Sequence, residues 1–161
     1  MAFELIVSTF SERLYWHIRR MVNHHEDADD VLQNTFIKIW RNMDSFRGDS
    51  KLYTWLYRIA TNEALDHIRK NKKSQLVGAD GESVEYDNAS GDLYFDGEMA
   101  EAKLHSAIAS LPEKQRLVFN LKYFEEMKYE DMAEVTGTSV GALKASYSLA
   151  VGKIKEFVSK D

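Results

Sequence analysis

A segment without positive charge divides this 161-residue chain into two parts. Residues 74–102 contain eight Asp/Glu and no Lys/Arg, and half of the eight glycines lie between Gly78 and Gly97. A segment of this composition buries too little apolar surface to offset the entropy lost on ordering. We therefore expect an all-α protein of two small helical domains, residues 1–73 and 101–161, joined by a flexible acidic linker over residues 74–100.

The formal net charge of −5 belongs to this middle segment. Residues 1–73 carry 12 Lys/Arg and 10 Asp/Glu, and residues 103–161 carry 9 and 8, so each flank is slightly positive. Local charge, and not the net charge of the chain, decides whether a surface contacts phosphate. The acidic composition therefore leaves nucleic-acid binding open for both flanks.

The composition also excludes several classes of protein. The chain has no cysteine, which excludes disulfides and thiolate metal sites. Its apolar runs are too short to span a membrane, and charged residues interrupt the first twenty positions. We expect a cytoplasmic protein with no membrane insertion and no cofactor.

Apolar residues at three- and four-residue steps predict helices over residues 3–22 and 28–41. For the second helix, Asp27 is the predicted cap, and the predicted buried stripe consists of Leu32, Phe36, Ile39 and Trp40. Its other face shows Asp30, Gln33, Asn34, Lys38 and Arg41. Taken alone, this face is either a solvated surface or a docking surface for a partner.

A third helix of about twenty residues follows Ser50. One of its sides gathers cations, an amide and an indole, from Lys51, Trp55, Arg58, Asn62 and Arg69. The tail from Arg69 to Lys73 adds four positive charges in five residues. This combination suits a nucleic-acid strand, although a solvated helix with a basic end remains the alternative.

The C-terminal part predicts a helix-turn-helix. A helix over residues 101–111 and another after Pro112 precede a short helix at 129–136, a turn at 137–139 and a long helix at 140–158 capped by Ser139. The predicted core residues are Met132, Ala133, Val135, Leu143, Tyr147, Ala150 and Ile154. A helical hairpin without a binding role has the same pattern.

Catalytic motifs give only weak alternatives. The run from His24 to Asp27 contains metal-ligand residue types, but adjacent loop residues rarely converge on one ion. A small hydrolase using a metal and the carboxylates between Glu26 and Asp30 is conceivable, yet acids at a helix start have a simpler explanation in the helix dipole. We expect a protein that is not an enzyme.

Four sequence motifs follow one another in a recognisable order. They are Asp29–Trp40 (DDVLQNTFIKIW), Asp44–Ser50 (DSFRGDS), Tyr53–Asn62 (YTWLYRIATN) and, after the acidic linker, Leu111–Arg116 (LPEKQR), followed by the helix-turn-helix. This order closely resembles the extracytoplasmic-function class of bacterial RNA polymerase sigma factors, which keep only the second and fourth sigma domains. The resemblance covers nearly the whole chain apart from the linker.

The resemblance implies roles for the first domain. The helix at Asp29–Trp40 would dock on the clamp coiled coil of the largest polymerase subunit, through Asp30, Gln33, Asn34 and Lys38. The loop and helix that follow would recognise the minus-ten element, with one non-template base flipped into a pocket. The residues expected to contact DNA there are Phe46, Arg47, Gly48, Asp49, Ser50, Tyr53, Trp55, Arg58, Asn62, Arg69, Lys70, Lys72 and Lys73.

The second domain resembles the part of the family that binds the minus-thirty-five element. The residues expected to contact DNA there are Thr138, Ser139, Ala142, Lys144, Ala145, Ser148 and Lys153. Many family members carry arginines across this recognition helix, whereas this chain has none there. Without a bidentate arginine–guanine pair, we expect weaker recognition led by DNA shape, at an A·T-rich site.

The expected partners are core RNA polymerase, promoter DNA and an anti-sigma factor clamped between the two domains. A stand-alone helix-turn-helix regulator that binds DNA as a dimer is the competing hypothesis. Such a regulator needs a dimer interface, and the chain has no heptad stripe or spare apolar face to supply one. We therefore expect a monomer when the protein is free.

Overall fold

The fold was analysed in a computed structural model of the chain, which describes residues 2–46, 48, 51–77 and 99–160. Every regular element in these ranges is helical, which confirms the predicted all-α class. Contacts divide the chain into two compact units. The first contains α1 to α3, and the second contains α4, α5, α7 and most of α6.

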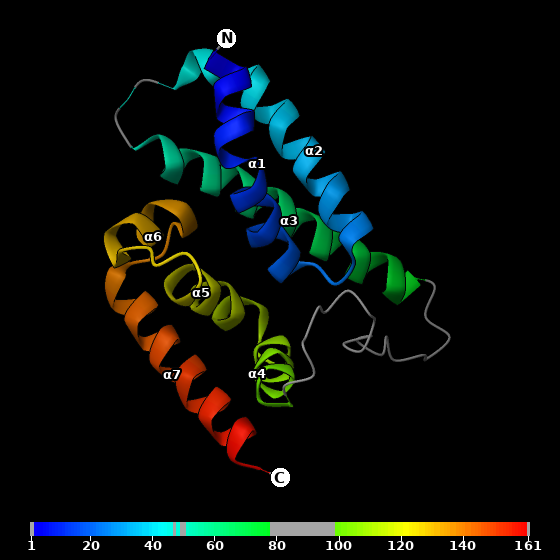
Figure 1. Cartoon of the computed structure of the whole chain (residues 1–161), viewed down its shortest axis with the longest axis vertical. Helices are drawn as coiled ribbons and strands as arrows, with labels where there is room; N and C mark the ends of the chain where they lie inside the picture. The colour runs from blue at the N-terminus through cyan, green and yellow to red at the C-terminus, as the bar shows by residue number, and fades with distance from the viewer. Residues whose placement is uncertain (1, 47, 49–50, 78–98, 161) are drawn as a thin grey trace. The chain divides into compact units, whose positions relative to one another are not determined.

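The first unit is a three-helix arrangement of α1 (Ala2–Met21), α2 (His25–Asn42) and α3 (Leu52–Val77), with a 3₁₀ turn at Met43–Ser45. Each of the three helices packs against the other two (Figure 1). Their apolar stripes meet in a core whose most deeply buried members are Leu14, Ile18, Ala28, Val31, Ile39, Leu56, Tyr57, Ala60 and Ala64.

Helix α2 starts earlier than the sequence suggested. The N–H of Ala28 donates to the carbonyl of His24 at 3.0 Å, so the helix begins at His25 and the prediction of Asp27 as its cap is wrong. Asp27 lies instead in the first helical turn, 3.6 Å from Nε2 of His67 on α3. The prediction that Trp40 belongs to the buried stripe is also wrong, because this residue is 63% exposed.

Both edges of the predicted linker are helical. Helix α3 continues through Val77, four residues past the predicted end of the first domain at Lys73. Helix α4 (Met99–Ala109) starts two residues before the predicted second domain. The rest of the predicted linker, residues 78–98, lies outside the described residues.

The second unit consists of α4, α5 (Glu113–Tyr123), α6 (Tyr129–Thr136) and α7 (Val140–Ser159). Helix α7 packs against α4 and α5 around an apolar cluster. The buried members of this cluster are Ala107, Ile108, Leu111, Phe119, Ala150 and Ile154. The aromatic ring of Tyr147 stacks on Phe119 at its edge, with centroids 5.8 Å apart.

Helices α6 and α7 form the predicted helix-turn-helix, and the turn residues behave as expected. Gly137 ends α6 at φ +71°, a left-handed conformation that favours glycine, and its N–H donates to Ala133 at 2.8 Å. Ser139 caps α7, because its hydroxyl accepts from the N–H of Ala142 at 3.2 Å.

Candidate nucleic-acid interface

One side of α3 presents the predicted cations to solvent. Arg58, Asn62, Arg69, Lys70, Lys72 and Lys73 are all exposed. The helix holds them along a single element, because residues 58, 62, 69 and 73 recur at steps close to whole helical turns. Cations in a row match the repeated charges of a nucleic-acid backbone.

The prediction that Trp55 lies on this exposed face is wrong, because the residue is buried, while its place in the DNA-binding set stays a prediction. Its side chain is only 9% exposed, and its ring packs on Phe46 with centroids 5.1 Å apart. Phe46 is half-buried. The indole therefore holds the start of α3 against the chain that leads into it, and little of it is left for a base to stack on.

Tyr53, like Phe46, is an aromatic side chain of the predicted set that stays partly accessible. It is half-buried, it packs edge-on against Tyr57 at 6.3 Å, and Nζ of Lys51 lies 5.9 Å from its ring centroid. In the loop before α3, Gly48 adopts φ +73°, which favours glycine. Arg47, Asp49 and Ser50 lie outside the described residues.

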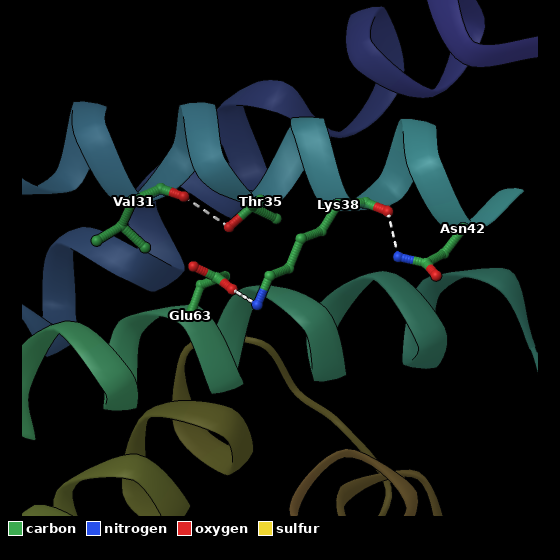
Figure 2. A network of polar contacts seen from close by, with 5 residues as sticks. All are labelled: Val31, Thr35, Lys38, Asn42 and Glu63. Carbon is green, nitrogen blue, oxygen red and sulfur yellow. Dashed lines mark hydrogen bonds and ion pairs between the residues drawn. The ribbon is translucent and has the colours of Figure 1, made fainter.

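The residues on either side of Asn62 are tied to the other two helices of the first unit. Oγ1 of Thr61 lies 2.8 Å from Nε2 of His17 on α1. The carboxylate of Glu63 forms an ion pair with Nζ of Lys38 on α2, and the two side chains point toward one another (Figure 2). Neither His17 nor Glu63 was predicted as a functional residue, because nothing in the sequence indicates which side chain of another helix lies opposite each of them.

His17 is held in its neutral form. Burial disfavours the charged imidazole, and together with the nearby Arg20 it lowers the pKa of His17 from 6.5 to about 3. Its Nδ1 atom is buried and makes no hydrogen bond. Because an orphaned buried N–H is rarer than an orphaned acceptor, we assign the imidazole proton to Nε2, which then donates to Thr61.

The outer face of α2 presents the predicted docking residues. Asp30, Gln33, Asn34 and Lys38 are all exposed. Two apolar residues share this face, Ile37 at 42% and Trp40 at 63% exposure, and sequence analysis did not assign them to it. Their position on the helical wheel was the available signal, because Ile37 is seven residues after Asp30 and Trp40 seven after Gln33.

The outer face of α7 carries mostly small side chains, together with the lysines Lys144 and Lys153. Ala142, Lys144, Ala145, Ser148 and Lys153 are exposed as predicted for a recognition helix, Ser139 is exposed at its start, and Thr138 is half-buried. Leu149, which sequence analysis did not single out, is 57% exposed. Nζ of Lys144 lies 5.7 Å from the ring centroid of Tyr129 on α6, and Nζ of Lys122 lies 4.4 Å from it.

Among the residues that the structure describes, no three His, Cys, Asp or Glu side chains are grouped so as to hold a metal ion. Within the same ranges, no helix combines the length and the apolar character that crossing a membrane requires.

Family comparisons agree with the two-part architecture. The Sigma-70 region 2 family matches residues 6–74, and the Sigma-70, region 4 family matches residues 101–154. The RNA polymerase sigma-H factor of Pseudomonas aeruginosa is 37% identical over 153 residues, covering 89% of this chain and 79% of the relative. The ECF RNA polymerase sigma factor SigW of Bacillus subtilis is 34% identical over 152 residues, covering 89% and 81%.

Two solved structures share the fold. The sigma factor RpoE of Bartonella quintana, solved with the anti-sigma factor NepR, has a TM-score of 0.83 at 26% identity, covering 99% of this chain and 98% of that one. CnrH, solved with the cytosolic domain of CnrY, has a TM-score of 0.73 at 25% identity, covering 99% and 89%. The chain therefore belongs to the extracytoplasmic-function class of RNA polymerase sigma factors, the subunits that direct core polymerase to promoters.

Proposed function

We propose that the two units of this sigma factor divide promoter recognition between them. The first unit, residues 1–77, recognises the minus-ten element through α3 and the loop before it. The second unit, residues 99–161, contacts the minus-thirty-five element through α7. The observation that carries the proposal is the exposed amide of Asn62 among the exposed cations of α3.

At the minus-ten element, the protein must stabilise a base that has left the stack. Unstacking costs a few kcal/mol, and stacking on an aromatic side chain returns about 1–3 kcal/mol for each base. Tyr53 supplies that surface in this proposal, since Trp55 is buried. Asn62 hydrogen-bonds the base edge, the loop at Phe46–Ser50 encloses the base, and the phosphates are held by Arg58, Arg69, Lys70, Lys72 and Lys73.

At the minus-thirty-five element, α7 lies in the major groove. Ala142 and Ala145 contact thymine methyl groups, while Lys144, Ser148 and Lys153 contact phosphates or make single hydrogen bonds. Backbone amides near Thr138 and Ser139, at the start of the helix, contact a phosphate. The N–H of Ala142 already donates to the side-chain oxygen of Ser139, so we do not assign that amide to a phosphate contact.

Polymerase docking is assigned to the outer face of α2. Asp30, Gln33 and Asn34 are exposed there and form the polar part of the contact with the clamp coiled coil. The protein acts in the cytoplasm as a dissociable subunit with no catalytic step of its own.

An anti-sigma factor is the proposed regulator. The structure of RpoE was obtained with the anti-sigma factor NepR, and that of CnrH with the cytosolic domain of CnrY. We propose that a partner of this kind holds the present chain inactive by covering the surfaces of both units.

Transcription with purified components tests the proposal. The full chain is mixed with core polymerase and a library of genomic fragments, and the start sites are mapped, with core polymerase alone as the control. The proposal predicts discrete start sites that share an upstream sequence at a fixed spacing. Starts distributed as they are for core polymerase alone would contradict it.

A further inference from the structure

Asn62 lies between two side-chain ties that reach different helices. Thr61, the residue before it, contacts His17 on α1, and Glu63, the residue after it, pairs with Lys38 on α2 (Figure 2). Consecutive residues of an α-helix are rotated by about 100°, so Thr61 and Glu63 point to the two sides of the direction in which Asn62 points. The two ties therefore resist rotation of α3 about its own axis in both senses.

Each contact involves a nearly buried side chain, so breaking either of them is unfavourable. The side chain of Glu63 is 11% exposed, and Thr61 and His17 are 1% and 0% exposed. A nearly buried carboxylate that loses its cation is left with an uncompensated charge, which is strongly unfavourable. Helix α3 therefore has one favoured rotation, the one that keeps both ties, and in that rotation the Asn62 amide is exposed.

Lys38 consequently has a second candidate role. Its ammonium is engaged by Glu63 within the same unit, although the side chain as a whole is 52% exposed. A polymerase contact would have to compete with a nearly buried carboxylate for this ammonium. The pairing favours a role inside the chain over the docking role that the resemblance implies.

We propose that Lys38 and His17 are positioning residues for minus-ten recognition, which hold the Asn62 amide in place through Glu63 and Thr61. The inference rests on the proposed role of Asn62 at the flipped base. A small displacement of a positioned group weakens recognition as it weakens catalysis. Breaking either contact should therefore lower base discrimination without removing any DNA contact.

The test compares four variants of the full chain, Glu63→Gln, Lys38→Met, Thr61→Val and Asn62→Ala, and the double variant of Asn62→Ala with Glu63→Gln, each assembled with core polymerase. Open-complex formation is measured on four promoters that differ only at the flipped base, and the affinity for core polymerase is measured separately. Glu63→Gln keeps the shape of the side chain, and circular dichroism establishes the temperature range in which every variant is folded. The matched control is the exposed pair of Glu156 and Lys160 on α7, changed by Glu156→Gln and Lys160→Met.

Glu63→Gln and Lys38→Met are each expected to lower the preference for the favoured base about fivefold to tenfold, while the affinity for core polymerase stays within about twofold of wild type. In the Asn62→Ala background, Glu63→Gln is expected to add less than about a twofold change, because the group that it positions is gone. Thr61→Val, which removes the hydroxyl that contacts His17, is expected to act in the same direction. The control variants leave both measurements unchanged.

Three outcomes separate the possible failures. If Lys38→Met weakens core binding and Glu63→Gln does not, Lys38 is a polymerase contact and the inference is wrong. If Asn62→Ala alters base preference while Glu63→Gln and Lys38→Met do not, only the inference is wrong. If Asn62→Ala itself leaves base preference unchanged, the proposed role of Asn62 is refuted, and the inference with it.

Discussion

Helices α3 and α7 are both assigned to DNA, yet they expose different chemistry. The exposed side of α3 carries Arg58, Asn62 and Arg69, whereas the exposed side of α7 carries Ala142, Ala145 and Leu149 over its first turns. Cations attract any phosphate and an amide hydrogen-bonds a base edge, while small apolar groups distinguish little beyond the thymine methyl. We therefore propose that most of the sequence recognition by this chain lies on the first unit.

The two units also differ in how their helices are fixed. The first unit has long-range polar ties, His17 to Thr61 and Lys38 to Glu63. The second unit combines an apolar cluster and local caps at Gly137 and Ser139 with a polar contact between elements, in which Nη1 of Arg116 donates to the carbonyl of Ala109 at 3.4 Å. The polar contacts of the first unit flank Asn62 on α3, whereas Arg116 lies on α5 and not on the predicted recognition helix α7.

Ala145→Arg should give the largest change, because it supplies α7 with the group that it lacks. An arginine–guanine pair is worth about 1–3 kcal/mol, so binding to upstream DNA with a guanine in register should strengthen about tenfold or more. Fluorescence anisotropy with guanine-substituted duplexes measures this. The control Glu156→Arg, farther along the same helix, should strengthen binding without a guanine preference. Identical behaviour of the two variants would place α7 outside the groove.

The double variant Asp30→Ala and Gln33→Ala separates docking on α2 from DNA recognition on α3. Loss of two exposed polar contacts should weaken the affinity for core polymerase about tenfold, while the assembled enzyme keeps its promoter preference. Competition binding and start-site mapping measure the two effects. Asp29→Ala, an exposed change outside the assigned docking set, is the control. Equal defects in affinity and promoter preference would contradict the separation.

Ser139→Ala tests the local caps of the second unit. Removing the hydroxyl that accepts from the N–H of Ala142 should destabilise that unit by about 1 kcal/mol, the usual value for an N-cap. Hydrogen exchange of the first-turn amides of α7 measures the loss. Ser159→Ala, at the other end of the helix, should change stability by less than a few tenths of a kcal/mol, on the scale of surface substitutions. Equal effects at both ends would argue against the cap.

His17 tests the polar ties of the first unit through pH. Its pKa is about 3 when folded and 6.5 when free, so the unfolded chain binds more protons between these values. This contribution to stability is fully present above pH 6.5 and decreases as the pH falls toward 3. Between about pH 7.5 and 5.5 the wild type should lose on the order of 1 kcal/mol more than His17→Gln.

Tryptophan fluorescence during urea unfolding isolates this effect, because Trp16, Trp40 and Trp55 all lie on α1 to α3. The difference between wild type and His17→Gln removes the contributions of the other titrating groups. An equal loss of stability in both proteins would mean that His17 is protonated in the folded state.

Local signals were sufficient to predict the helix-turn-helix. Gly137 and Ser139 mark the turn through their own backbone and side-chain preferences, and the structure agrees at both positions. Burial was less predictable. Trp55 is close on the helical wheel to Arg58, and only its packing on Phe46 decides that it is buried.

The ties around Asn62 were beyond sequence analysis. His17 and Thr61 are 44 positions apart, and Lys38 and Glu63 belong to different helices. Single-helix periodicity describes which face of a helix is apolar, but it does not say which polar side chain of another helix lies opposite. On α2, the exposure of the polar residues was predicted, whereas that of Ile37 and Trp40 was not.

A promoter library compares base recognition by the two units in one experiment. Both the minus-ten and the minus-thirty-five positions are randomised, the full chain and core polymerase transcribe the pool, and the enriched sequences are read. We expect strong base preference at the minus-ten positions, weaker A·T-rich preference upstream, and loss of the minus-ten preference in Asn62→Ala. Preference concentrated upstream, unchanged by Asn62→Ala, would contradict this expectation.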